Sequence, residues 1–165
     1  MYICISTNIK IMTKKVFISL VIILLPFLSA MGQNSLNNAA DNIVGIYSGD
    51  QKGDKFKAKI VKLSNGTYRG QVIWMEHDKD ANGKKRLDTK NPDKKLRNVP
   101  CDQIVLFSGL KYDADDKEWN GTKIYDPQRG MRAKLTIRFE KDGRLRLRGS
   151  LLGIGESVYW NKIKE

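Results

Sequence analysis

The chain has 165 residues, of which 30 are lysine or arginine and 18 are aspartate or glutamate, so its net charge is +12. This length suits one domain around a single hydrophobic core and excludes two such domains. Beyond the first 32 residues the sequence has one histidine, His77, and one cysteine, Cys101, which are too few for the zinc proteins that need three or four spaced His and Cys ligands.

An export signal is predicted over residues 1–32. Lysines precede an apolar run from Val16 to Ala30, and Ala30-Met31-Gly32 has the small-x-small pattern of a cleavage site. A run of about 15 residues is shorter than the roughly 20 that a membrane span needs. We therefore expect cleavage near Gly32, a periplasmic or extracellular location, and no transmembrane segment in the mature chain.

Residues 33–41 are polar and are predicted to be a flexible N-terminal stretch. A single domain is expected to follow over residues 42–165. Removing the signal takes away Cys4, so Cys101 has no partner for an internal disulfide, and burial is the more frequent fate of such a thiol.

Eight strands are predicted from the alternation of apolar and polar residues and from the turn residues between them. In chain order they cover residues 42–48, 55–63, 67–75, 103–112, 117–125, 131–140, 144–149 and 156–164. The clearest hairpin signals are Asn65-Gly66 and Asp142-Gly143. The segment from Glu76 to Asp102 breaks the alternation and is predicted to be one long loop between the third and fourth strands.

Short strands joined mostly by tight turns favour an all-β fold, an up-and-down antiparallel barrel of about eight strands. Closure of such a sheet removes its exposed edges, and a sandwich is the alternative. An eight-stranded barrel is either filled by side chains or holds one small ligand. Both alternatives stay open at this point.

Aromatic side chains at inward or strand positions supply either a packed core or the lining of a ligand pocket. The residues predicted to bind a small, partly apolar ligand are Phe56, Tyr68, Trp74, Trp119, Tyr125 and Phe139. No nucleophile, paired carboxylate or complete metal loop stands out around them. We therefore expect no enzyme, no cofactor and no metal site.

Two weak chemical signals lie at or near the ends of the long loop. His77 and Cys101 could form a dyad only if the two ends of the loop met. The segment 78–83 imitates the first half of a calcium loop, but Thr89 stands where a bidentate Glu is needed. A turn rich in Asp, Asn and Gly is the better interpretation.

Basic residues alternate with the apolar ones between positions 131 and 149 and are predicted to share the outer face of the sheet. A surface of this kind attracts polyanions. Its predicted members are Arg132, Lys134, Arg138, Arg144, Arg146 and Arg148. For an exported protein the expected partner is an anionic envelope lipid or glycan rather than nucleic acid, and a solvated exterior that keeps the protein soluble is the alternative.

Several short motifs are spread along the expected domain. They are Gly45-Ile46-Tyr47, the segment 70–74, Asp88 with Asn91-Pro92, the segment 119–121, the segment 124–127 with Gly130, Leu147-Arg148-Gly149 and Tyr159-Trp160. On these motifs the chain resembles an uncharacterised family of small secreted bacterial proteins, domain of unknown function 2147, which is similar to lipocalin and calycin barrels. The resemblance implies a barrel, export and binding of a small molecule, and it carries over no catalytic residue.

Gly45-Ile46-Tyr47 also resembles a degenerate lipocalin G-x-W signature, in which the aromatic ring plugs the barrel base under a basic side chain from a late strand. Lys162 and Arg148 are the candidates for that basic side chain. The function we expect is that of an exported lipocalin-like binding protein for a small, partly apolar ligand. The alternative is an envelope-associating structural or adhesion module that uses its basic outer face.

Overall fold

The structure is a computed structural model that describes residues 35–163. The predicted export signal and its cleavage site lie outside the described residues. No helix within 35–163 has the length and apolar character needed to span a membrane.

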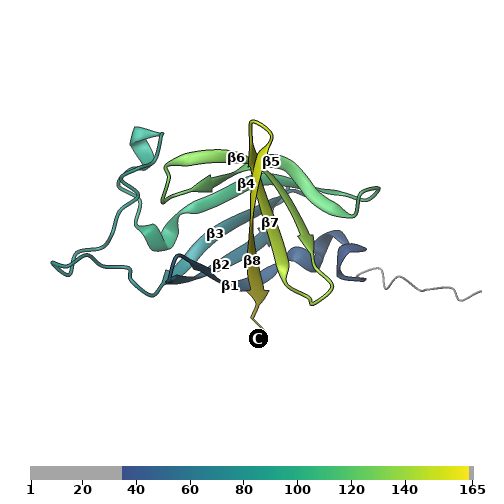
Figure 1. Cartoon of the computed structure of the whole chain (residues 1–165), viewed down its shortest axis with the longest axis horizontal. Helices are drawn as coiled ribbons and strands as arrows, with labels where there is room; N and C mark the ends of the chain where they lie inside the picture. The colour runs from purple at the N-terminus through teal and green to yellow at the C-terminus, as the bar shows by residue number, and fades with distance from the viewer. Residues whose placement is uncertain (1–34, 164–165) are drawn as a thin grey trace, which may run out of the picture. The chain divides into compact units, whose positions relative to one another are not determined.

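Eight antiparallel strands form a closed barrel in which each strand pairs with its sequence neighbours and β1 pairs with β8 (Figure 1). The strands are β1 (Gly45–Gln51), β2 (Asp54–Lys62), β3 (Tyr68–Met75), β4 (Val105–Asp113), β5 (Glu118–Asp126), β6 (Met131–Phe139), β7 (Leu145–Leu151) and β8 (Ile154–Lys162). The up-and-down barrel is confirmed and the sandwich is excluded. The long loop lies between β3 and β4, as predicted.

The alternation in β6 and β7 separates a buried face from a basic one. Leu135 and Ile137 are fully buried, while Arg138 faces out directly opposite Arg146 of β7. The turn between the two strands needs Gly143, which has a φ of +82°. Period-two patterning therefore predicted this hairpin correctly.

Residues 35–43, which precede the barrel and include most of the stretch predicted to be flexible, contain short helices that pack on the barrel. Two 3₁₀ helices, η1 (Ser35–Asn37) and η2 (Ala40–Ile43), cover one end of the barrel. Asn37 is 4% exposed, and its amide donates to the carbonyl of Phe139 at 2.9 Å and accepts from the same residue's N–H at 2.7 Å. One polar side chain thus replaces a missing strand partner, which residue composition alone does not reveal.

We call η1 and η2 together the plug. Tyr47 occupies the base of the barrel beside it. It is fully buried and donates its hydroxyl hydrogen bond to the carbonyl of Ile43 at 2.8 Å. The ammonium of Lys162 lies 5.8 Å from the Tyr47 ring centroid and also donates to the carbonyl of Asn42. Lys162, and not Arg148, is therefore the basic side chain that stacks on the signature aromatic.

The long loop is ordered around one buried carboxylate, Asp88. Its oxygens accept hydrogen bonds from the Tyr125 hydroxyl at 2.7 Å and from the Asn91 amide at 2.6 Å. Two further 3₁₀ turns, η3 (Lys94–Leu96) and η4 (Cys101–Gln103), lie between β3 and β4. The hydrogen bonds of Asp88 hold the loop against β5, beside one end of the barrel.

Candidate ligand-binding site

A cavity of about 1170 Å³ opens at the end of the barrel opposite the plug. Its walls come from the last residues of β1, β3, β5 and β7 and the first residues of β2, β4, β6 and β8, together with the long loop. The apolar side chains that line it include Phe56, Val72, Met75, Cys101, Ile104, Leu106, Ile124, Ala133, Leu147, Val158 and Trp160. The lining is therefore a continuation of the inward faces of the strands.

The other half of the barrel is filled. Trp119 and Phe139 pack edge to face at 5.9 Å between ring centroids, and Tyr112 lies 5.1 Å from Trp119. Trp160 separates the two halves, since it contacts Tyr47 on one side and Phe56 on the other, at 6.3 and 5.6 Å. The two sequence alternatives, packed core and ligand pocket, each describe one half of the same barrel.

Two of the six aromatic residues predicted to bind a ligand line the cavity, namely Phe56 and Tyr125. Tyr68, Trp119 and Phe139 do not, because they lie in the filled half. The polar groups of Trp119 and Tyr68 turn toward the plug: the Trp119 indole donates to the carbonyl of Ala40 and the Tyr68 hydroxyl to Asp41. Alternation predicts which side chains point inward, but it does not predict their depth along the barrel.

Trp74 is outside the barrel, which corrects its prediction as an inward residue. The register between β2 and β3 shifts at a bulge, where Lys57 faces Trp74 while the adjacent Ala58 faces Val72. The extra residue reverses the alternation, so Met75 turns into the cavity and Trp74 stays 43% exposed. On the outer surface the Lys57 ammonium lies over the Trp74 ring, 5.4 Å from its centroid, in a cation–π contact.

Tyr125 reaches the cavity from the opposite face of its strand. It pairs with the outward Arg132, whose guanidinium lies 5.2 Å from the ring centroid, while the preceding Ile124 pairs with the inward Ala133. Tyr125 is nevertheless only 1% exposed, because the long loop covers it. Burial, with the Asp88 carboxylate second, raises the pKa of Tyr125 well above its usual value, so the hydroxyl stays a donor.

The rim of the cavity is charged, and several of its charges are paired within the rim. Arg86 contacts Asp54 at 2.9 Å, and Arg129 binds both carboxylate oxygens of Glu156 at 2.6 and 3.2 Å. The Arg129 contact lowers the pKa of Glu156 below its usual value. The rim is therefore polar, and these ion pairs hold its side chains in place.

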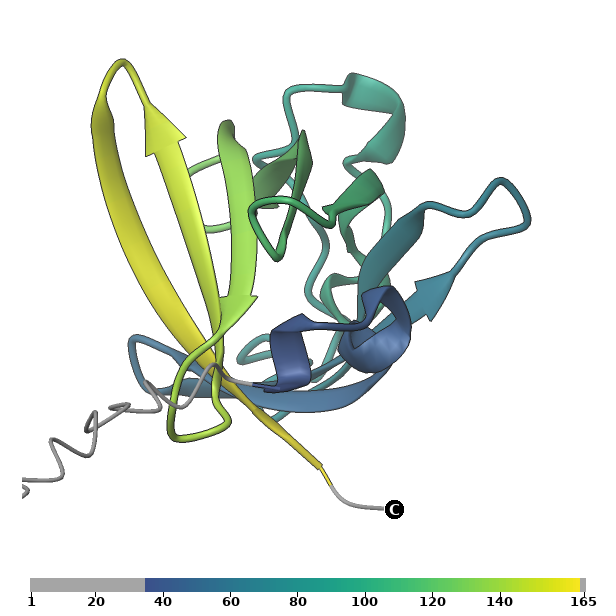
Figure 2. The same ribbon diagram turned by 90° about the vertical axis from the view of Figure 1, so that its right-hand side faces the viewer.

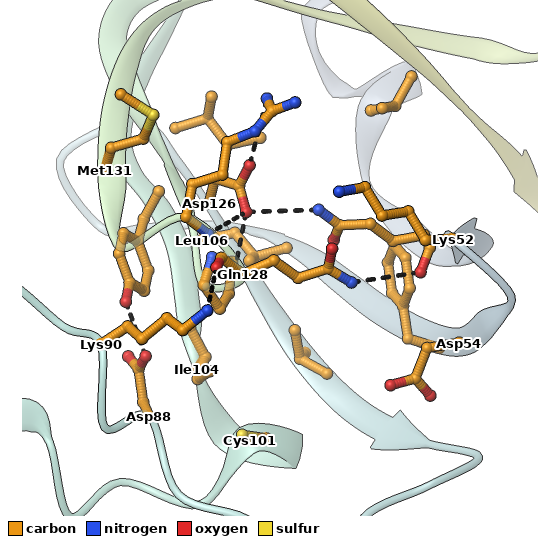
Figure 3. Close-up of a pocket in the computed structure, with 18 of the residues that line it drawn as sticks. Lys52, Asp54, Asp88, Lys90, Cys101, Ile104, Leu106, Asp126, Gln128 and Met131 are labelled. Atoms are coloured by element: carbon orange, nitrogen blue, oxygen red, sulfur yellow. Dashed lines mark hydrogen bonds and ion pairs between the residues drawn. The ribbon is translucent and has the colours of Figure 1, made fainter.

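A polar bridge crosses the mouth between opposite walls of the barrel. Gln51, at the end of β1, donates to Asp126 of β5 at 3.4 Å, and Gln128 donates back to the carbonyl of Gln51 at 3.3 Å. Figure 3 shows Asp126 and Gln128 on one side of the pocket and the hairpin that carries Lys52 on the other. We name this contact the Gln51–Gln128 bridge; it narrows the route into the cavity.

Cys101 is a free thiol in the cavity wall and is half-buried, so it is not a fully enclosed core residue. Burial raises the pKa of its thiol, which leaves it protonated near neutral pH. His77 contacts Asp54 at 3.3 Å. The geometry supplies no activated nucleophile at either residue.

Carboxylate oxygens of the segment 78–83, the possible half of a calcium loop, bind groups of the long loop itself. Asp78 binds the Lys85 ammonium at 2.6 Å, and Asp80 accepts N–H bonds from Asn82 and Lys84 at 2.9 Å each. Among residues 35–163, no three His, Cys, Asp or Glu side chains gather in a way that would hold a metal ion.

The six predicted basic residues lie together on the outer faces of β6 and β7 or at the start of β7. Several have intramolecular partners. Arg144 contacts Asp142 at 2.7 Å and lies 4.6 Å from the Tyr159 ring centroid, and Arg146 contacts Glu140 at 3.0 Å. The predicted basic surface is therefore present, but part of its charge is balanced by carboxylates of the turn between β6 and β7.

A closed antiparallel barrel that is plugged at one end and open to a lined cavity at the other has a lipocalin-like fold. Protein HP1028 from the human pathogen Helicobacter pylori, described as belonging to the lipocalin family, shares this fold with a TM-score of 0.58. The two sequences are 23% identical, over 74% of this chain and 83% of that chain.

Residues 41–162 match a protein family described as "Uncharacterized protein conserved in bacteria", DUF2147, and the chain belongs to it. The match spans the barrel and most of the second plug helix. No curated protein matches the sequence.

Proposed function

We propose that this protein is exported and binds a small, partly apolar molecule in the open half of its barrel. The observation that carries the proposal is the cavity itself, which lies where an eight-stranded barrel has room for one small ligand. Ligand pockets usually have volumes of about 300–1000 Å³, so this one accommodates a whole small molecule.

The lining suggests the chemistry of the ligand. Phe56, Leu106 and Leu147 belong to an apolar wall, and burial of apolar surface against it contributes about 25 cal/mol per Å². The charged rim and the Gln51–Gln128 bridge offer polar groups only at the entrance. A molecule with an apolar body and one polar end fits this distribution.

We further propose that the protein acts by binding and not by catalysis. Arg86 and Arg129 are engaged by carboxylates of the same rim, and the raised pKa of Cys101 disfavours its thiolate. Export rests on the sequence of residues 1–32.

Native mass spectrometry of the protein purified from the cells that make it tests the binding proposal. We expect a retained ligand to appear as added mass that is lost on denaturation. Ala133→Phe places a ring inside the cavity and should abolish the added mass, whereas Thr136→Phe places the same ring outside on the same strand and should retain it. Equal added mass in both variants would contradict an interior site.

The second candidate function is docking of the outer basic face on an anionic envelope component. One observation favours it: Arg138 and Arg146 face each other directly across β6 and β7, where like charges are destabilising, and the Glu140 contact of Arg146 supplies one negative charge beside these two positive ones. A bound polyanion would relieve the repulsion. Charge reversal at Arg144, Arg146 and Arg148 should then abolish salt-sensitive binding to anionic lipid and leave interior binding unchanged.

A further inference from the structure

The turn between β7 and β8 exposes three large apolar residues within a run of four, the remaining one being Gly153. Leu152 is 95% exposed, Ile154 is 78% exposed and Leu151 is 45% exposed. In Figure 2 this hairpin, drawn in yellow, extends beyond the neighbouring end of β6. We name residues 151–154 the hairpin tip.

Folding of this chain does not account for Leu152. Its φ is +50°, a left-handed conformation that asparagine or glycine adopts more easily than leucine. The corresponding turn between β1 and β2 has the same backbone form, and there Lys52 occupies the position, with a φ of +56°. At Leu152 the sequence thus accepts an unfavourable backbone conformation and full exposure of an apolar side chain together.

The hairpin tip borders the cavity mouth. Leu151 pairs with Ile154 across the hairpin, and both line the entrance together with Leu152. Apolar surface is therefore continuous from the tip into the cavity wall. A hydrophobic phase that covered the tip would also meet the entrance.

Positive charge surrounds the hairpin tip. The Arg148 guanidinium packs over Gly155, and Lys134 pairs with Ser150 on the neighbouring strand. Lys52 lies close enough to Glu156 to lower the pKa of that carboxyl, second to Arg129. Glu156 is itself bound by Arg129, so the net charge around the tip is positive.

We propose that the hairpin tip inserts into the surface of an anionic phospholipid bilayer, with the cavity mouth facing the lipid. Apolar side chains flanked by Lys and Arg are what an anionic interface binds. Positive charge complementary to the lipid distinguishes this occupant from a second copy of the chain, whose basic surface would repel its own kind. In this orientation a molecule passes between bilayer and cavity without crossing water.

Flotation with vesicles of phosphatidylglycerol and phosphatidylethanolamine tests the proposal, with vesicles of phosphatidylcholine alone as the comparison. We expect the protein to float with the anionic vesicles and much less with the neutral ones. Leu152→Asn should weaken binding by about tenfold or more, the loss expected from one fully buried leucine. Because asparagine suits the backbone at this position, the variant should fold at least as well.

Two controls separate the contributions. Tyr159→Asn removes an exposed aromatic residue from the outer face of β8, closer to the plug, and should leave vesicle binding unchanged. Lys52→Asn should weaken binding to anionic vesicles and reduce its dependence on salt. Circular dichroism and thermal unfolding confirm that each variant is folded.

Equal flotation of wild type and Leu152→Asn would overturn the proposal, as would equal binding to both kinds of vesicle. Self-association that Leu152→Asn abolishes, without any vesicle binding, would show that a second copy covers the tip, and would also overturn it. None of these results depends on a ligand in the cavity. Insertion of the hairpin tip into a bilayer and binding of a ligand in the cavity can therefore be disproved separately.

Discussion

Tyr125 and Asp88 are joined by a buried hydrogen bond of 2.7 Å that ties the long loop to β5. The two residues are 37 positions apart, and both are at most 3% exposed. The bond turns a segment of irregular sequence into one wall of the cavity. Asn91 completes the arrangement by donating to the second oxygen of the same carboxylate.

Tyr125→Phe should lower the free energy of unfolding by about 1.5–3 kcal/mol, because it removes a hydrogen bond to a buried charged acceptor. Hydrogen exchange should accelerate at the amides of Asp88 and Asn91, which bond to carbonyls within the loop. Tyr159→Phe, at an exposed tyrosine, is the control and should change neither quantity. Unaltered exchange in the loop of Tyr125→Phe would show that the loop is held by other contacts.

The three tryptophans report on three different environments. Trp160 lines the cavity, Trp119 is buried in the filled half, and Trp74 is on the outer surface. Ligand binding should therefore quench the fluorescence of wild type and of Trp74→Phe, and the change should largely disappear in Trp160→Phe. Quenching that depended on Trp74 would place the ligand outside the barrel.

Asn37→Ala should destabilise the protein by about 2–4 kcal/mol, since it removes two hydrogen bonds and leaves the Phe139 backbone groups without them. Asn38→Ala changes the exposed neighbour and is the matched control. Thermal and urea unfolding of the two variants measure the difference. Equal stabilities would mean that the plug does not contribute to the fold.

Stability should fall as the pH rises above 10, the ordinary pKa of tyrosine. Burial raises the pKa of Tyr47, Tyr68 and Tyr125 in the folded state, so the unfolded chain loses these protons first and alkali favours unfolding. Each tyrosine contributes at most about 1.4 kcal/mol per pH unit. Burial lowers the pKa of Lys162, which opposes this slope by at most one proton.

Urea unfolding measured between pH 8 and 11 tests this dependence. Tyr47→Phe should be less sensitive to alkali than wild type, even though it loses the hydrogen bond to Ile43. A stability that rises above pH 10 in wild type would contradict the burial of the three hydroxyls.

The barrel itself follows from local sequence, whereas the cavity depends on contacts between distant parts of the chain. Alternation in β6 and β7 and glycine-containing turns predict the strands, because pleating and turn geometry are local properties. Phe56 was predicted inward and lines the cavity. Trp74 was also predicted inward, but a single bulge residue reversed its side, and alternation does not reveal a bulge.

The depth of a residue along the barrel was not predictable either. Trp119 and Trp160 both alternate with polar residues, yet only Trp160 reaches the cavity. Which end is filled depends on the plug, whose anchor is the long-range contact between Asn37 and Phe139. Composition marked that segment as polar, and its burial arises from tertiary hydrogen bonds.

Methyl NMR spectroscopy of the protein with its retained ligand tests the central claim most directly, because it locates the ligand within the barrel. On ligand removal we predict shifts of the methyl signals of Val72, Leu106 and Leu147, which line the cavity, and little change at Leu135 and Leu145 in the filled half. Shifts confined to outward-facing methyl groups such as Ile73, with the cavity signals unchanged, would contradict an interior binding site.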